Sequence, residues 1–263
     1  MDILRVVRYL ALVFWGLPWT LLASELIDIK RDVELAISLK PNLDNGRILY
    51  SLCIVCHSPE GWGSHNGYYP QIAGQLPGVL IKQLADIRAR NRDNPTMLPF
   101  SLLQALGGVQ GMADVSAYIS ALPMSRDSDV GPGFDLALGE ELYRKECAEC
   151  HGDRGEGDDK EHIPMLQGQH YSYLKRQFNW IRIGKRRNAD EKMVKQIQRF
   201  SQREISAMMD YVSRLKPPQE KLAPPGWQNP DFPGFSRTNL PPEMHRRDWR
   251  ELPLPPTRPT MPQ

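Results

Sequence analysis

The pattern Cys-x-x-Cys-His occurs twice in the chain, at 53–57 and at 147–151, and the two copies contain all four cysteines. This spacing is typical of covalent attachment of a c-type haem. Two thiols three positions apart on a short helical turn can reach the two vinyl groups of one porphyrin, and the next side chain presents an imidazole to the iron. The sequence therefore predicts two haem c groups, attached through Cys53, Cys56, Cys147 and Cys150, with His57 and His151 as iron ligands.

Other uses of paired cysteines explain the pattern less well. Two Cys-x-x-Cys pairs can form one tetrahedral zinc site, but these pairs lie 94 positions apart (147 − 53), and zinc leaves both histidines unexplained. A thioredoxin-like pair needs a βαβ setting, and no strand-rich pattern lies nearby. Structural disulfides suit an exported protein but do not account for the repeated histidine.

An internal repeat surrounds the two motifs. At the same offset of 94 the chain matches Pro70 with Pro164, Gly74 with Gly168, Leu80 with Leu174, Gln83 with Gln177, and Ile87 with Ile181. Near the end of each copy the offset is 93, as for Tyr118 and Tyr211. Self-similarity at a fixed offset indicates duplication of one structural unit. We therefore expect two similar domains, at residues 43–124 and 134–216.

Helical periodicity dominates both copies. Ser201 and Glu204 form the sequence of a capping box, and apolar residues then recur on one helical face until Pro217. The first copy ends in the same way, before Pro123, and each copy has an amphipathic middle segment. Because no run of alternating apolar residues indicates strands, the predicted fold is all-α, with two tandem domains related by internal duplication.

The segment before the repeat predicts export. Residues 1–24 have a basic start, an uncharged and mostly apolar stretch, and small residues at Ala23 and Ser24, which is typical of a cleaved signal peptide. The apolar stretch is short for a membrane span, which needs about 20 apolar residues, although a retained N-terminal anchor is an alternative. Residues 25–42 predict a short helix leading into the first domain.

Two further segments lie outside the helical pattern. Residues 125–133 are polar and rich in helix-breaking residues, and they predict a linker between the domains. Residues 217–263 are rich in proline and carry little periodic apolar sequence, so we expect an extended or disordered tail. Its aromatic residues could attach parts of it to the domains or to a partner; they are Trp227, Phe232, Phe235 and Trp249.

The second axial ligand of each iron separates electron transfer from catalysis, because a methionine thioether closes the iron and raises its potential. Met97 and Met193 are the candidates, since they lie between the middle and last helices, in irregular stretches, at matching distances after their motifs. The last helices contain three methionines that suit a core position better, namely Met112, Met208 and Met209. The remaining candidates are Met124 and Met165, and Met165 directly follows Pro164, close to the proximal side. Three histidines without a counterpart in the other copy are weaker rivals, namely His65, His162 and His170.

In these features the chain resembles the two-haem class I cytochromes c of the cytochrome c4 family. The resemblance rests on CIVCH and CAECH, on PQIAGQ and PMLQGQ, on the middle helices and on the two methionine positions, and it spans roughly residues 43–216. It implies two haem-bearing helical domains related by a pseudo-twofold axis, and a role in electron carriage. In that family a proline carbonyl accepts a hydrogen bond from the far nitrogen of the haem histidine, which implies this role for Pro70 and Pro164.

The chain departs from the family pattern in places. Ser58 follows the first motif where Gly152 follows the second, and the Met193 segment lacks the prolines that flank Met97. The Pro-rich C-terminal extension lies outside the resemblance. The complete fold prediction is thus two tandem class I cytochrome c domains followed by that extension.

The sequence predicts a periplasmic electron carrier of the respiratory chain rather than an enzyme. Its expected partners are redox proteins: a membrane respiratory complex, a terminal oxidase, or a periplasmic dehydrogenase or reductase. The alternatives are a haem-bearing subunit of a periplasmic oxidoreductase or respiratory complex, and a two-haem peroxidase-like enzyme. A peroxidase leaves one iron open, so a methionine at both haems argues against it. The net charge of +2 over 263 residues does not indicate nucleic-acid binding.

A basic cluster occurs only in the second copy. It consists of Lys175, Arg176, Arg182, Lys185, Arg186 and Arg187. Such a cluster can steer an acidic redox partner or associate with an anionic membrane surface. The alternative is a solvated helix face balanced by nearby carboxylates.

Overall fold

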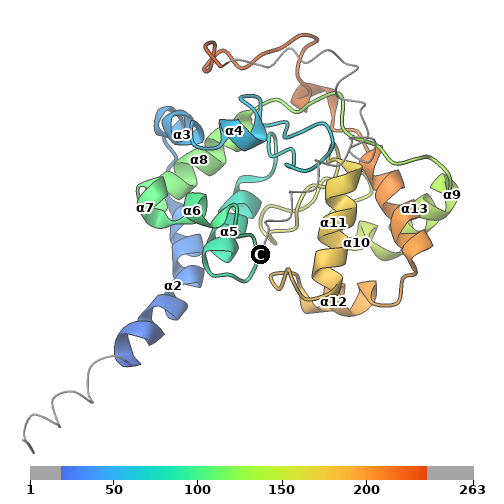
Figure 1. Ribbon diagram of the computed structural model, residues 1–263, viewed down its shortest axis with the longest axis horizontal. Coiled ribbons are helices and arrows are strands. Elements are labelled where there is room, and N and C mark those ends of the chain that lie inside the picture. Colours follow the sequence, from blue (N-terminus) through green and yellow to red (C-terminus); the bar gives the residue numbers. More distant parts are fainter. Residues whose placement is uncertain (1–18, 236–263) are drawn as a thin grey trace, which may run out of the picture.

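The computed structural model describes residues 19–235, with side chains from residue 29 onward. In this part of the chain the regular structure is helical, and the only β-pairing consists of isolated bridges. The prediction of an all-α fold is confirmed. Figure 1 shows two groups of helices side by side, the first coloured blue to green and the second yellow-green to orange.

The helices of each group follow the order of the repeat. The first group comprises α2 (Trp19–Ser38), α3 (Leu43–Tyr50), α4 (Ile54–His57), α5 (Pro77–Arg88), α6 (Leu98–Ser101), α7 (Leu103–Leu106) and α8 (Val109–Ala121). The second comprises α9 (Leu136–Glu146), α10 (Ala148–His151), α11 (Tyr171–Arg182), α12 (Glu191–Ile197) and α13 (Gln202–Ser213), before the short 3-10 helix η1 (Gln219–Lys221). The predicted capping box at Ser201 and Glu204 begins α13.

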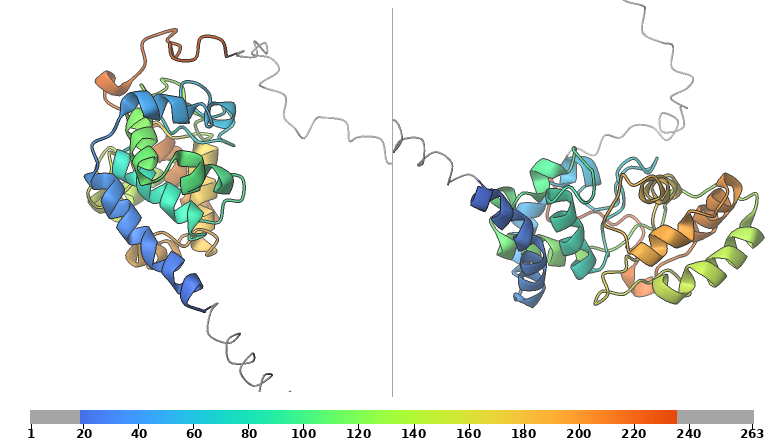
Figure 2. Two further views of the ribbon diagram at one scale, coloured as in Figure 1. Left: turned by 90° about the vertical axis from the view of Figure 1, so that its left-hand side faces the viewer. Right: turned by 90° about the horizontal axis from the view of Figure 1, so that it is seen from below.

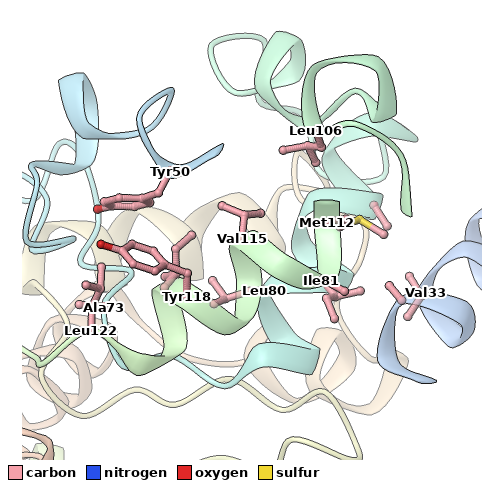
Figure 3. Close-up of a cluster of buried hydrophobic side chains, with 14 residues drawn as sticks. Val33, Tyr50, Ala73, Leu80, Ile81, Leu106, Met112, Val115, Tyr118 and Leu122 are labelled. Atoms are coloured by element: carbon pink, nitrogen blue, oxygen red, sulfur yellow. The ribbon is translucent and has the colours of Figure 1, made fainter. Parts of the chain in front are cut away.

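Each group has its own hydrophobic core. In the first group, Tyr50 lies against Tyr118 beside Val115 and Leu80 (Figure 3), with ring centroids of the two tyrosines 5.3 Å apart. In the second group, Tyr143 and Tyr211 repeat this pair at 5.7 Å. The duplication seen in the sequence is therefore also present in the packing.

Helices α3 and α8 of the first group, like α9 and α13 of the second, cross closely at a glycine. A Cβ atom on Gly46 of α3 would collide with the carbonyl oxygen of Asp114 in α8, and one on Gly139 of α9 would collide with that of Ala207 in α13. Only glycine allows two helix backbones to approach so closely. This crossing fixes α3 or α9, which leads directly into the motif, against the last helix.

The two groups meet through hydrogen bonds that repeat under exchange of the copies. The Gln71 amide N–H donates to Gln169 Oε1 at 3.1 Å, and the Met165 amide N–H donates to Gln75 Oε1 at 3.0 Å. Gln71 is equivalent to Met165 and Gln75 to Gln169 at the offset of 94, so these contacts are one contact made twice. A contact that recurs when the partners exchange places defines a twofold relation.

The flanking segments differ in part from expectation. The helix expected within residues 25–42 is α2, which begins at Trp19 and ends at Ser38. Most of the proposed signal peptide at 1–24 lies outside the described residues. No helix found within residues 19–235 is long and apolar enough to cross a membrane.

The linker and the first part of the tail are held by specific contacts. Within 125–133, the Ser125 amide N–H donates to Gln71 Oε1 at 2.8 Å, and Gly133 donates to Asp210. The tail does not leave the molecule at Pro217, because residues 218–235 return to the first group of helices, as the orange segment in Figure 2 shows. The rest of the expected tail, including Trp249, lies outside the described residues.

Candidate haem sites

The two motif histidines make the same hydrogen bond. His57 ends α4, and its Nδ1 lies 3.0 Å from the carbonyl oxygen of Pro70. His151 ends α10, with Nδ1 3.1 Å from the Pro164 carbonyl oxygen. Because a carbonyl only accepts hydrogen bonds, Nδ1 of each ring carries the proton, and Nε2 keeps the lone pair that can bind a metal.

Burial keeps both imidazoles in this neutral form. His57 is 5% exposed, and desolvation lowers its pKa below the usual value of 6.5, against the opposing effect of the Pro70 hydrogen bond. The pKa of His151 is lowered for the same reason. A neutral imidazole with a fixed ring orientation is the form that an iron ligand requires.

The four cysteines lie in two Cys-x-x-Cys pairs, and none of them forms a disulfide bond. Cys53 and Cys147 are partly buried, and burial raises the pKa of each thiol to about 12. Among the described residues, no three His, Cys, Asp or Glu side chains gather in a way that could hold a metal ion. The two pairs therefore do not converge on a shared tetrahedral zinc site, which leaves each pair beside its own histidine.

The structure distinguishes the two candidate methionines from the others. Met97 directly precedes α6 and is partly buried, as is Met193. The expectation of an irregular segment around Met193 is wrong, because Asp190 caps α12 and the residue lies in that helix. The other methionines of the two copies are buried; they are Met112, Met124, Met165, Met208 and Met209.

The rival histidines are placed differently. His65 is exposed. His170 is 2% exposed, and both its ring nitrogens are engaged: Nδ1 accepts from the Asp129 amide at 3.0 Å, and Nε2 donates to the Trp62 carbonyl at 2.8 Å. His170 therefore joins the linker and the first group of helices instead of pointing a free nitrogen at a metal.

Two arginines between the groups test whether the chain suits a haem. Arg92 and Arg186 form an antiparallel bridge, and their guanidiniums bond to neutral oxygens of Gln83 and Gln177. Neither has a carboxylate within ion-pair distance among the described residues, and Nε of Arg92 is buried without a partner. Burial lowers the pKa of Arg186 to about 9. A haem carries two propionates, so two arginines without an ion-paired carboxylate among the described residues fit that group.

The internal repeat could have identified these two arginines, which helical periodicity alone does not single out. Arg92 and Arg186 match at the offset of 94, each following a middle helix. Arg186 belongs to the basic cluster, but its guanidinium donates to Gln177 and Gln83 between the two groups and does not lie on a solvated helix face. Arg176 of that cluster is also engaged, since it lies over the rings of Tyr68, Tyr173 and Trp180.

The fold and the sites together define a class of protein: an all-α, two-domain class I cytochrome c, with two haem c groups as its cofactors. The family model "Cytochrome c" matches residues 136–216. Cytochrome c4 of Azotobacter vinelandii is 30% identical over 183 residues, which cover 63% of this chain and 85% of the relative. The chain belongs to the cytochrome c4 family, and it is an electron-transfer haem protein.

Two further comparisons agree with this assignment. The crystal structure of reduced recombinant cytochrome c4 from Pseudomonas stutzeri superimposes with a TM-score of 0.60 at 27% identity, covering 67% of this chain and 100% of that chain. A protein of Stutzerimonas stutzeri (strain A1501) named thiosulfate dehydrogenase electron acceptor is 30% identical over 200 residues, which cover 69% of this chain and 91% of the relative.

Proposed function

We propose that the protein is exported to the periplasm and carries electrons between redox partners, without a catalytic activity of its own. One haem is bound by Cys53 and Cys56, with His57 and Met97 at the iron. The other is bound by Cys147 and Cys150, with His151 and Met193 at the iron. The observation that carries this proposal is the repeated geometry of a neutral imidazole that donates to a proline carbonyl, Pro70 or Pro164, next to a cysteine pair.

The bound haem supplies one-electron exchange at iron, and the chain supplies a fixed environment. The Pro70 carbonyl holds the His57 ring in one orientation and makes its Nε2 a stronger electron-pair donor to the iron. Tyr50 donates its hydroxyl proton to the carbonyl of Ser58 at 2.8 Å, and Tyr143 donates to Gly152 at 2.6 Å. These contacts fix the backbone after each histidine, so electron exchange involves little rearrangement of the protein.

The surfaces beside the two motifs support docking of different partners. Around the first motif, exposed apolar side chains follow one another at a spacing of four and then three residues: Ile48 (59% exposed), Leu52 (44%) and Val55 (78%). The equivalent positions around the second motif are acidic: Glu141, Glu146 and Glu149. Exposed apolar groups indicate an interaction surface, and redox encounters use small interfaces. We infer that an uncharged apolar partner docks at the first haem.

A specific partner class has support from one comparison. The relative named thiosulfate dehydrogenase electron acceptor matches over 91% of its length. By analogy, a periplasmic dehydrogenase is a suitable electron donor for this chain, and the chain can also serve as the haem-bearing subunit of such an enzyme. Copurification with a dehydrogenase favours the subunit, whereas a freely soluble monomer that such an enzyme reduces favours the carrier.

The optical spectrum of the oxidised protein tests the axial ligands. A methionine–iron bond gives a weak absorption band in the far red, which two haems with the proposed ligands share equally. Met97→Ala and Met193→Ala should each remove about half of its intensity, and Met112→Ala, as a matched control in the core, should leave it unchanged. High-spin iron at either haem of the unaltered protein contradicts the carrier and favours the peroxidase-like enzyme.

A further inference from the structure

The segment that follows the second domain makes specific contacts with the first domain. After α13 the strap, defined here as residues 218–232, pairs with the end of the first domain through a parallel bridge between Leu222 and Met124. The Met124 amide N–H donates to the Lys221 carbonyl at 2.7 Å, and the Ala223 amide N–H donates to the Met124 carbonyl at 2.9 Å. The strap thus crosses from the second domain to the first.

The strap then covers the loop that follows the first motif. Trp227 lies against Trp62, with ring centroids 5.8 Å apart, and Phe232 lies against Tyr50 at 5.8 Å. Between these two aromatic contacts, Asn229 is buried to 2% exposure. A buried primary amide needs several hydrogen-bond partners, so the partners of Asn229 show what the strap holds.

Asn229 bonds to the backbone next to the histidine. Its side-chain Nδ2 donates to the carbonyl oxygen of Pro59 at 2.7 Å and to the hydroxyl of Tyr118 at 3.1 Å. Its backbone N–H donates to Glu60 Oε1 at 3.3 Å. Pro59 is separated from His57 by one residue, Ser58. The carbonyl groups of Ser58 and Pro59 are therefore held by Tyr50 and Asn229 respectively.

Ser58 has a backbone conformation that side chains avoid. Its φ of 65° and ψ of 159° lie in a region that is almost exclusive to glycine. The equivalent Gly152 has a φ of 81° and ψ of 160°, so the second domain adopts the same turn with the residue that suits it. A strained residue persists only where its surroundings over-determine it, and the strap supplies such surroundings in the first domain.

The second domain has the glycine and lacks the strap. The positions equivalent to Pro59 and Glu60 are Asp153 and Arg154, which are exposed. His57 is also more buried than His151. The strained serine and the covering strap thus occur together at one site, and both are missing from the other.

We propose that the strap is a positioning element for the first haem site, and that Asn229 is its positioning residue. Through Pro59, Asn229 keeps the Ser58 backbone in its strained conformation, and so keeps His57 against Pro70 in a water-shielded site. The second haem site does not depend on the strap. This inference rests on the proposed function in taking His57 and Met97 as the ligands of the first haem.

Release of the strap should act on one haem. In Asn229→Ala, the loop at 58–63 loses a buried hydrogen-bond partner, so its amide hydrogen exchange should accelerate by on the order of tenfold. Water then approaches the first site, and a more exposed haem has a lower reduction potential. The potential of the first haem, identified as the transition that Met97→Ala moves, should fall, while that of the second haem stays constant. Gln228→Ala, an exposed neighbour in the strap, is the matched control.

A double variant separates positioning from general destabilisation. Glycine adopts the Ser58 conformation without strain, so Ser58→Gly should remove the need for Asn229 to hold the backbone. The change in exchange and in first-haem potential caused by Asn229→Ala should therefore be largely absent in the Ser58→Gly background. If Asn229→Ala does not fold, Trp227→Ala releases the strap at another contact and is measured in the same two backgrounds.

The proposal is overturned if strap release accelerates exchange at 58–63 but leaves the first-haem potential unchanged, or moves both potentials alike. It is also overturned if Ser58→Gly gives no rescue. Haem content, measured on every variant, distinguishes this failure from failure of the proposed function, since an unaltered protein without two attached haems contradicts the function itself.

Discussion

At the scale of single residues, the two motifs differ most at the position after the histidine. Ser58 occupies a backbone region with a cost of about 1–3 kcal/mol for a residue with a side chain, whereas Gly152 occupies the same region freely. Sequence comparison of the two copies reveals this substitution. It does not reveal that the serine keeps the glycine conformation, because that depends on hydrogen bonds from the Tyr50 hydroxyl and from Asn229, which is distant in sequence.

Replacing this serine should stabilise the protein. We expect Ser58→Gly to raise the free energy of unfolding by about 1 kcal/mol, since relief of strain exceeds the added backbone entropy of glycine in the unfolded chain. Urea unfolding of the haem-loaded protein measures the change. The reverse substitution, Gly152→Ser, should destabilise the second domain, and a Ser58→Gly variant that is less stable than the original contradicts the assignment of strain.

At the scale of helices, the crossing of α3 with α8 positions the first motif. A side chain on Gly46 collides with backbone, which cannot move aside as a flexible side chain can. Gly46→Ala should therefore cost about 1–3 kcal/mol in the free energy of unfolding, and Gly139→Ala should cost a similar amount. Gly234→Ala, where a Cβ would meet nothing within 4 Å, is the control. If Gly46→Ala leaves the thermal unfolding of the protein unchanged, the close crossing of the two helices is contradicted.

The surface of α3 and α4 carries a prediction about docking. Val55→Glu gives the first motif the acidic residue of the second. Reduction by a redox protein with an uncharged, apolar docking face should therefore slow by on the order of tenfold, the effect of losing one central contact. Glu149→Val is the matched change around the second motif and should not slow this reaction. Stopped-flow rates that are equal in Val55→Glu and the unaltered protein would show that docking does not use this surface.

At the scale of the whole molecule, the sequence predicted the parts better than their joining. The motifs, the offset of 94 and the capping box at Ser201 are local patterns, so they gave the helices and the two-copy architecture. The linker and strap contacts depend on pairs such as Asn229 with Pro59, which no period or motif reports. Gln71 and Gln169 both lie within the repeat, so the sequence contains both residues of the contact between the domains. Only the structure shows that these two residues face and bond to one another.

We expect the joining of the domains to depend on pH through His170. Desolvation by burial lowers its pKa below 6.5, against the opposing effects of the Trp62 carbonyl and the Asp129 carboxylate. Protonation would also break the hydrogen bond that Nδ1 accepts from the Asp129 amide. The unfolded chain binds this proton more readily, so stability is full above about pH 6.5 and declines as pH falls towards the lower folded-state pKa. His170→Gln should make unfolding less dependent on pH in that window. A pH profile identical to that of the unaltered protein contradicts this role.

Mass spectrometry of the intact, purified protein tests the central claim most directly. Two haems, one on each Cys-x-x-Cys-His motif, should add the mass of two haem groups, and proteolysis should place one on the peptide with Cys53 and Cys56 and the other on the peptide with Cys147 and Cys150. A single added haem, or none, on protein purified from the periplasm of a host that attaches c-type haem would contradict the account.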